Sequence, residues 1–172
     1  EAGLPSGVLN VVTGDAEVGQ ALVNDPRVAM VSVTGSPGAG RAVMATAASA
    51  TKRVHLELGG KAPALVFADA DLGAAAKALA MAATYNSGQD CTAATRIHVE
   101  ETVAAEFTTV LAETLGQIRV GAPDDSATDI GPLISTGHRD RVHGFVERAV
   151  AAGACVAVGG AVPEGPGAYY PP

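Results

Sequence analysis

Short, valine-rich apolar stretches alternate along this chain with longer alanine-rich stretches, and glycine-rich turns lie between them. Residues 28–33 have the composition of a strand, residues 41–50 have the spacing of a helix, and residues 52–58 again indicate a strand. Such alternation is typical of a parallel, doubly wound α/β sheet. The same criteria predict strands at residues 7–13, 64–67, 95–99 and 155–158, and helices at residues 16–24, 71–86, 101–115 and 135–152.

The composition favours a closely packed protein rather than a disordered tail. Of the 172 residues, 48% are hydrophobic and only 17% are charged. The apolar residues are mainly Ala and Val, and only 3% are aromatic, so the core must consist of small contacts. Gly59-Gly60 ends the strand predicted at residues 52–58 abruptly. We therefore expect a domain boundary there, between residues 1–59 and residues 60–172.

The charge excludes two classes of partner. The formal net charge is −7, and no basic cluster is longer than Lys52-Arg53, so the chain has no series of cations for nucleic acid or an anionic membrane surface. Apolar runs such as residues 72–85 are shorter than the roughly 20 residues that a membrane span needs. Cys91 and Cys155 lie far apart without CxxC spacing, which predicts neither a disulfide scaffold nor a metal site.

The two ends of the sequence lead to two further expectations. The first residues contain neither a basic segment nor an apolar one, so we expect no signal peptide and a cytoplasmic protein. The last residues, 169–172, contain no recognisable end of a domain. We expect the chain to be an internal fragment of a longer protein.

A glycine-rich turn, residues 35–40, connects a predicted strand to a predicted helix. Free backbone N–H groups and the positive end of a helix dipole meet at such a point, which suits a phosphate group. Arg41 and Ala42 replace the Lys and hydroxyl of a P-loop, and Pro37 interrupts the three-glycine dinucleotide fingerprint. A turn that only requires positive φ remains an equal alternative.

A carboxylate and a thiol stand out as candidate catalytic groups. Glu57 lies at the C-terminal end of a predicted strand, where parallel sheets present ligand-binding groups, although a solvated strand end is the alternative. Cys91 lies in a polar loop after a helix, whereas Cys155 lies in an apolar stretch and is expected in the core. A thiol with a usable base can attack a carbonyl. His55 faces the Glu57 side of the strand and could assist proton transfer, or be a surface residue only.

These motifs closely resemble the aldehyde dehydrogenase superfamily, in particular its members that act on aminobutyraldehyde and betaine aldehyde. The resemblance implies an α/β fold with parts of two doubly wound domains, coenzyme-binding (1–59) and catalytic (60–172). It covers essentially the whole chain, through the blocks Glu1-Ala2-Gly3-Leu4-Pro5-Ser6-Gly7-Val8-Leu9-Asn10-Val11-Val12, Val33-Thr34-Gly35-Ser36, Leu56-Glu57-Leu58-Gly59-Gly60-Lys61, Gly88-Gln89-Asp90-Cys91 and Gly131-Pro132-Leu133-Ile134.

The resemblance also implies a mechanism and its residues. Cys91 would attack the aldehyde, the thiohemiacetal would pass hydride to NAD or NADP, and Glu57 would activate water to hydrolyse the thioester. We hypothesise that Asp90 attracts the ammonium group of a small amino aldehyde, the alternative being that it only solvates its loop. The resemblance assigns cofactor contacts to Gly19, Thr34, Gly35, Ser36, Ala39, Leu58 and Gly59.

The chain also departs from that family. It begins after the Trp-Asn segment that helps to form the oxyanion hole and ends before the Glu-x-Phe block, so we expect the isolated fragment to be inactive. The upstream residues that discriminate the adenosine ribose are also missing, so the choice between NAD and NADP stays open. The full-length protein is expected to form a homo-oligomer. Two other functions remain possible on these residues: a cofactor-independent cysteine thioesterase or esterase, and an inactive scaffold fragment.

Overall fold

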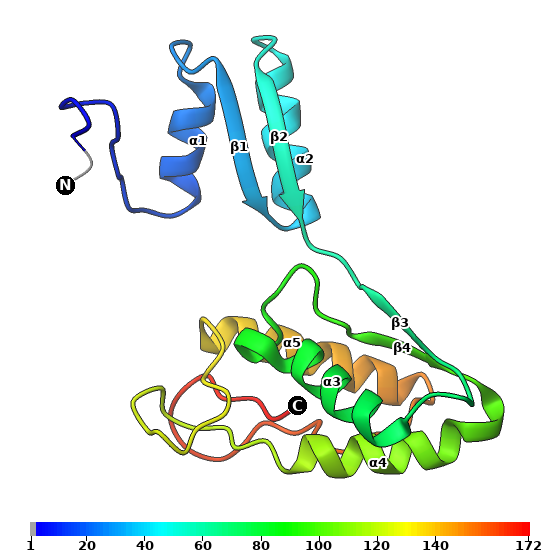
Figure 1. The fold of residues 1–172 in the computed structure, drawn as a ribbon. Coiled ribbons are helices and arrows are strands. Elements are labelled where there is room, and N and C mark those ends of the chain that lie inside the picture. The colour runs from blue at the N-terminus through cyan, green and yellow to red at the C-terminus, as the bar shows by residue number, and fades with distance from the viewer. Residues whose placement is uncertain (1–2) are drawn as a thin grey trace. The chain divides into compact units, whose positions relative to one another are not determined.

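The computed structural model describes residues 3–172, so Glu1 and Ala2 of the first resemblance block lie outside the described residues. The chain divides into two compact units, the first ending at Gly59 and the second running from Gly60 to Pro172. Each unit contains one two-stranded parallel sheet with helices packed beside it (Figure 1). The predicted α/β class is confirmed. The assignment of a coenzyme-binding and a catalytic part stays a prediction.

The first unit contains two helices and two strands. In chain order they are α1 (Ala16–Asn24), β1 (Met30–Gly35), α2 (Pro37–Ala48) and β2 (Arg53–Leu58). Asp15 caps α1 by accepting a hydrogen bond from the Glu17 amide, and Ser36 caps α2 in the same way from the Ala39 amide. The strands pair in parallel from Met30↔Arg53 to Gly35↔Leu58.

Close packing of α2 on the sheet depends on one glycine. Gly40 is buried, and a Cβ at this position would lie 2.7 Å from Cδ2 of Leu58 in β2. Only a residue without a side chain lets the helix approach the strand this closely. At the other end of the unit, Lys52 donates to the carbonyl oxygens of Val23 and Asp25, both at 2.6 Å, and so ties the end of α1 to the start of β2.

The second unit is larger and its core is built around Phe107. Val66, Ala76 and Phe107 are buried and lie in one cluster, against which Leu79, Ile97 and other side chains pack. The strands pair in parallel from Pro63↔Arg96 to Val66↔Val99. The elements are β3 (Pro63–Val66), α3 (Leu72–Thr84), the 3₁₀ turn η1 (Tyr85–Gly88), β4 (Arg96–Val99), the 3₁₀ turn η2 (Glu101–Val103), α4 (Ala104–Gly116) and α5 (Thr136–Ala151).

Two predicted strands do not form. Residues 7–13 have no strand structure, and Leu9 and Val11 expose 72% and 83% of their surface. Residues 155–158 also lack strand structure, and Cys155 is exposed, so its prediction as a core residue is wrong. An apolar run becomes a strand only where a neighbouring edge accepts its hydrogen bonds. Within residues 3–172, the strand pairs β1–β2 and β3–β4 do not include either segment.

Smaller differences concern the ends of helices. Helix α2 begins at Pro37 rather than near residue 41, because Ser36 provides the cap and proline suits the first turn of a helix. Helix α3 ends at Thr84, two residues earlier than predicted, where the chain enters η1.

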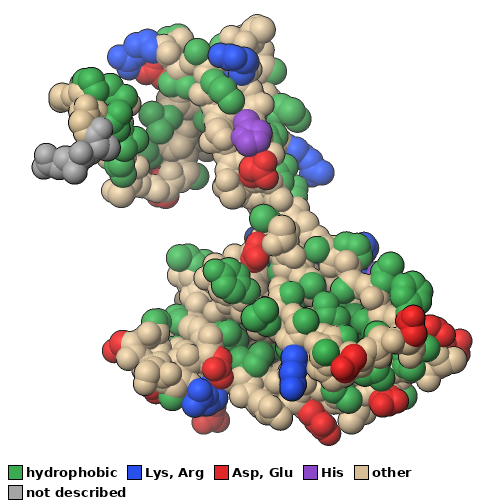
Figure 2. Space-filling view, viewed as in Figure 1, with side chains coloured by type: hydrophobic (Ala, Val, Ile, Leu, Met, Phe, Trp, Pro, Cys, Tyr) green, Lys and Arg blue, Asp and Glu red, His purple; other side chains and the backbone are tan. Residues whose placement is uncertain are grey.

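The surface carries many apolar side chains and few charged ones. Figure 2 shows hydrophobic side chains spread over each unit, with isolated acidic and basic side chains between them. Leu65, Phe67 and Met81 are examples, with 60–69% of their surface exposed. None of the helices in residues 3–172 combines the length and the apolar character required to cross a membrane.

Candidate active site

The C-terminal ends of β1 and β2 bring several predicted site residues together. Thr34 pairs with Glu57 and Gly35 pairs with Leu58 across the two strands. The Gly59 amide extends the pairing by donating to the Gly35 carbonyl oxygen at 3.3 Å. Thr34, Glu57 and Gly59 are exposed, so their polar groups can meet a ligand at this edge.

The start of α2 lies directly beyond this edge. Ser36 Oγ accepts a hydrogen bond from the Ala39 amide at 3.2 Å, and both residues are exposed. Figure 1 shows that α1, which contains Gly19, also begins on the side where the arrows of β1 and β2 end. A Cβ at Gly19 or Gly59 would meet no atom within 4 Å, so a ligand can approach the backbone there. Two helix N-termini beside strand ends suit a phosphate-bearing ligand.

Glu57 has specific polar neighbours on the exposed face of β2. His55 Nε2 lies 3.1 Å from Glu57 Oε1, and His55 Nδ1 lies 3.1 Å from Ser32 Oγ in β1. Arg53, His55 and Glu57 are all exposed while the alternate residues of β2 are half-buried, which confirms the predicted alternation. The side chain that sequence analysis missed is Ser32, whose register opposite His55 becomes visible only once the strands pair.

A strained turn precedes the thiol. Asn86 and Ser87 have φ values of 49° and 57°, and Gly88 follows at 74°. Left-handed backbone is uncommon for residues other than glycine, and it persists only where neighbouring contacts enforce it. Such strain occurs often at functional sites, and here it turns the chain sharply between α3 and Cys91.

Residues 131–134, named here the clamp segment, hold this turn from outside. Ser87 Oγ donates to the Gly131 carbonyl oxygen at 2.8 Å, and the Ile134 amide donates to Gln89 Oε1 at 2.9 Å. Asn86 and Gln89 also exchange hydrogen bonds between their side-chain amides and backbone carbonyl oxygens. The Gly131-Pro132-Leu133-Ile134 motif was recognised in the sequence, but its contact with Ser87 and Gln89 was not predicted.

Cys91 lies in the loop after this turn, and its side chain is exposed. The Asp90 carboxylate accepts hydrogen bonds from the Thr92 amide at 3.0 Å and from Thr92 Oγ1 at 3.1 Å. Those bonds, with a smaller contribution from the Cys91 thiol, hold the pKa of Asp90 below its ordinary value. Gly60 lies beside the loop, since a Cβ there would be 3.4 Å from the Cys91 carbonyl oxygen.

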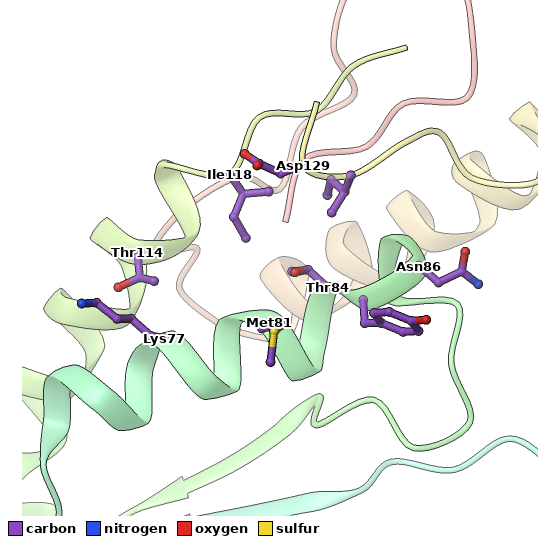
Figure 3. A pocket seen from close by; sticks show the side chains of 9 residues that line it. Lys77, Met81, Thr84, Asn86, Thr114, Ile118 and Asp129 are labelled. Carbon is purple, nitrogen blue, oxygen red and sulfur yellow. The ribbon is translucent and has the colours of Figure 1, made fainter. Parts of the chain in front are cut away.

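Two adjoining cavities lie in the second unit, and neither is lined by Cys91. One, of about 410 Å³, lies between α3, α4 and the chain at Asp129, with Lys77, Met81 and Thr114 on its walls (Figure 3). The other, of about 610 Å³, is lined by the clamp segment and by Ser87 and Gln89. The cavities share residues 86, 129 and 130.

The predicted site residues thus fall into two groups. Cys91 and Asp90 belong to the second unit, and the others belong to the first, where seven lie at the strand ends and the start of α2: Thr34, Gly35, Ser36, Ala39, Glu57, Leu58 and Gly59. The meeting of Glu57 and Cys91 at one substrate stays a prediction. Within residues 3–172, no group of three or more His, Cys, Asp or Glu side chains could hold a metal ion.

Comparison with known proteins gives matches over the whole sequence. The profile of the aldehyde dehydrogenase family matches residues 1–172. The chain is 48% identical to the lactaldehyde dehydrogenase of Escherichia coli K12 over 174 aligned residues and 44% identical to a betaine aldehyde dehydrogenase of Rhizobium etli over 175. Each alignment covers 100% of this chain and 36% of the relative. The chain spans about a third of the length of these relatives.

The similar solved structures are also aldehyde dehydrogenases. The crystal structure of E. coli lactaldehyde dehydrogenase matches 99% of this chain with a TM-score of 0.95 at 48% identity, and 36% of that structure is covered. A betaine aldehyde dehydrogenase from Staphylococcus aureus, crystallised with NAD+, matches 99% of this chain with a TM-score of 0.93 at 34% identity, and 35% of it is covered.

Proposed function

Because the chain belongs to the aldehyde dehydrogenase family, we propose that it carries the nucleophile and the general base of an NAD(P)-dependent aldehyde dehydrogenase. Cys91 is the nucleophile and Glu57 is the base. The observation that carries the proposal is an exposed thiol in the loop that follows a strained turn held by the clamp segment, within a chain whose strand ends present an exposed carboxylate.

The chain's own residues perform two steps in this proposal. The Cys91 sulfur forms a bond to the aldehyde carbon, and after that carbon is oxidised, the product is a thioester on Cys91. Glu57 then takes a proton from water, the resulting hydroxide adds to the thioester carbon, and the carbon–sulfur bond breaks to release the acid. When bound, the nicotinamide cofactor supplies the oxidation by accepting hydride from the thiohemiacetal carbon.

The start of α2 fits the phosphates of a dinucleotide. Its capped N-terminus, with exposed Ser36 and Ala39, offers amide groups and a positive dipole end beside Thr34 and Gly35. Leu58 and Gly59 continue the same edge toward the nicotinamide. We propose NAD as the cofactor, since the similar betaine aldehyde dehydrogenase was crystallised with NAD+.

The substrate is proposed to be a small aldehyde, with an amino aldehyde as the finer proposal. The relatives are named for lactaldehyde, betaine aldehyde and succinate semialdehyde, which differ in charge. Similarity alone therefore does not predict whether the substrate is neutral, cationic or anionic. The Asp90 carboxylate accepts hydrogen bonds from Thr92. Because a carboxylate has about four acceptor positions, it can still accept a hydrogen bond from a substrate ammonium group. Asp90→Asn should weaken kcat/KM for an amino aldehyde more than for its uncharged analogue.

Expression of the full reading frame that encodes this chain tests the proposal directly. The purified protein is mixed with a panel of small aldehydes and either NAD or NADP, NAD(P)H is followed by absorbance, and acyl adducts are mapped by rapid-quench mass spectrometry. We expect NADH formation and an adduct on Cys91. Adduct formation from esters without any dinucleotide binding would instead support a cysteine esterase, and an unreactive Cys91 would support an inactive scaffold.

A further inference from the structure

Three polar side chains form a continuous hydrogen-bonded row across the two strands of the first unit. Ser32 in β1 stands opposite His55 in β2, and Glu57 lies two residues further along the same face of β2. The Ser32 Oγ to His55 Nδ1 distance is 3.1 Å, and the His55 Nε2 to Glu57 Oε1 distance is also 3.1 Å. Both distances are within the range of good hydrogen bonds.

The chemistry of the three groups fixes a direction for these bonds. An ionised carboxylate can only accept, so Nε2 of His55 must carry the hydrogen that Glu57 receives. Neutral imidazole with a proton on Nε2 has an accepting Nδ1, and the Ser32 hydroxyl is able to donate to it. Ser32 therefore selects the tautomer of His55 that holds the ionised form of Glu57, in the same way that outer hydrogen bonds orient histidine in other sites.

We propose that His55 is a positioning residue for Glu57 and that Ser32 positions His55 in turn. This inference rests on the proposed function, in which Glu57 takes a proton from water during thioester hydrolysis. His55 holds the carboxylate in one rotamer while it is ionised and leaves its other oxygen free to face water. The row affects hydrolysis of the thioester and leaves the attack of Cys91 on the aldehyde unchanged.

The surroundings of His55 indicate that it positions Glu57 rather than stabilising the fold. The side chains of His55 and Glu57 are 56% and 61% exposed, and polar contacts between exposed side chains add little to folding stability. Arg53 lies on the same face of β2, and Thr34 stands opposite Glu57, yet within residues 3–172 the Glu57 carboxylate pairs with His55. Removing the imidazole should thus change a rate without changing the fold.

A matched pair of variants in the full reading frame tests His55. His55→Phe keeps a planar ring but has no donor, whereas His55→Gln keeps an N–H donor near the place of Nε2. Rapid-quench mass spectrometry with a small aldehyde and NAD measures the formation and the decay of the acyl adduct on Cys91 separately. We expect His55→Phe to slow adduct decay about tenfold with formation unchanged, and His55→Gln to restore most of the decay rate.

The Ser32 link is tested by a double-mutant cycle. Ser32→Ala should slow adduct decay a few-fold in the wild-type background because the required tautomer is no longer selected. In the His55→Gln background the same change should have no effect, since an amide has no tautomers. Equal effects of Ser32→Ala in the two backgrounds would overturn the tautomer part of the inference.

The outcomes separate this inference from the proposed function. A wild-type protein without any adduct on Cys91 would overturn the proposed function and the inference with it. A normal wild-type adduct whose decay is unchanged in His55→Phe, or a parallel loss of adduct formation and thermal stability in that variant, would overturn the inference alone.

Discussion

The two proposed reactive groups are presented by very different kinds of backbone. Glu57 is part of a regular strand, β2, whose register with β1 is fixed by consecutive parallel pairs. Cys91 follows a turn in which Asn86 and Ser87 adopt left-handed backbone, and this turn depends on contacts with the clamp segment more than 40 residues further along the chain.

The difference shows where each side chain gets its orientation. A strand orients Glu57 by local alternation, so its direction follows from residues next to it. The turn before the thiol is instead held by long-range hydrogen bonds of Ser87 and Gln89, against backbone strain. Apart from the link through His55 to Ser32, the orientation of Glu57 should therefore depend little on distant segments, whereas the environment of Cys91 should respond to changes in the clamp segment.

Removal of the thiol should have the largest effect. Cys91→Ala in the full-length protein is expected to lower kcat by at least about 1000-fold, because the covalent step has no other nucleophile. Cys155→Ala serves as the matched control, since Cys155 is exposed as well. Steady-state NADH formation measures both, and similar losses in the two variants would contradict the assignment.

Removal of the base should have the next largest effect. Glu57→Gln is expected to lower the rate of thioester hydrolysis by about 100- to 10,000-fold, the usual contribution of a general base. The acyl adduct on Cys91 should then accumulate in mass spectra. Glu113→Gln, on the exposed surface of α4, is the control. Loss of adduct formation in Glu57→Gln would mean that Glu57 acts before the thioester stage.

Removing the hydrogen bond between Ser87 and the clamp segment tests directly whether Cys91 depends on distant contacts. Ser87→Ala loses the bond to Gly131 and keeps the strained backbone, whereas Ser87→Gly loses the bond but relieves the strain. We expect Ser87→Ala to lower kcat about tenfold and Ser87→Gly to lower it less. The rate of iodoacetamide labelling of Cys91, with Cys155 as the internal reference, measures how the loop presents the thiol. Ser126→Ala in a nearby exposed loop should change neither quantity.

The smallest effect should come from Asp90, and it depends on pH. The folded-state pKa of Asp90 lies below its ordinary value because Thr92 donates to the carboxylate. The resulting stabilisation is present above the ordinary pKa of about 4 and disappears as pH falls through the lower, folded value. The thermal midpoint of wild type should exceed that of Asp90→Asn near pH 7, and the difference should vanish in acid. A difference that is constant with pH would contradict the role of the Thr92 bonds.

Local patterns were sufficient to predict the helices, the strands β1 to β4 and the exposure of Glu57, although two further predicted strands do not form. Alternation in β2 and the glycine pair after it predicted the exposure of Glu57, whereas the start of α2 at Pro37, capped by Ser36, was predicted about four residues late. The polar context of Cys91 correctly indicated an exposed thiol.

Features that need a partner segment were not predictable from local patterns. Val11 lies in an apolar run, but a strand also requires a neighbouring edge, which local sequence does not reveal. Cys155 lies in a similar run and is exposed for the same reason. The contacts of Ser87 and Gln89 with the clamp segment join positions more than 40 residues apart, and hydrophobic periodicity does not predict such contacts.

The close approach of Gly40 to Leu58 has a consequence for natural variation in this chain. A methyl group at position 40 would collide with the end of a side chain that we assign to the nicotinamide contact, so Leu58 would have to move or residue 58 become smaller. The two positions should therefore change together across variants that retain binding. A mutational scan should report intolerance at position 40 although Gly40 is not among the proposed cofactor contacts, and Leu58→Val should partly relieve it.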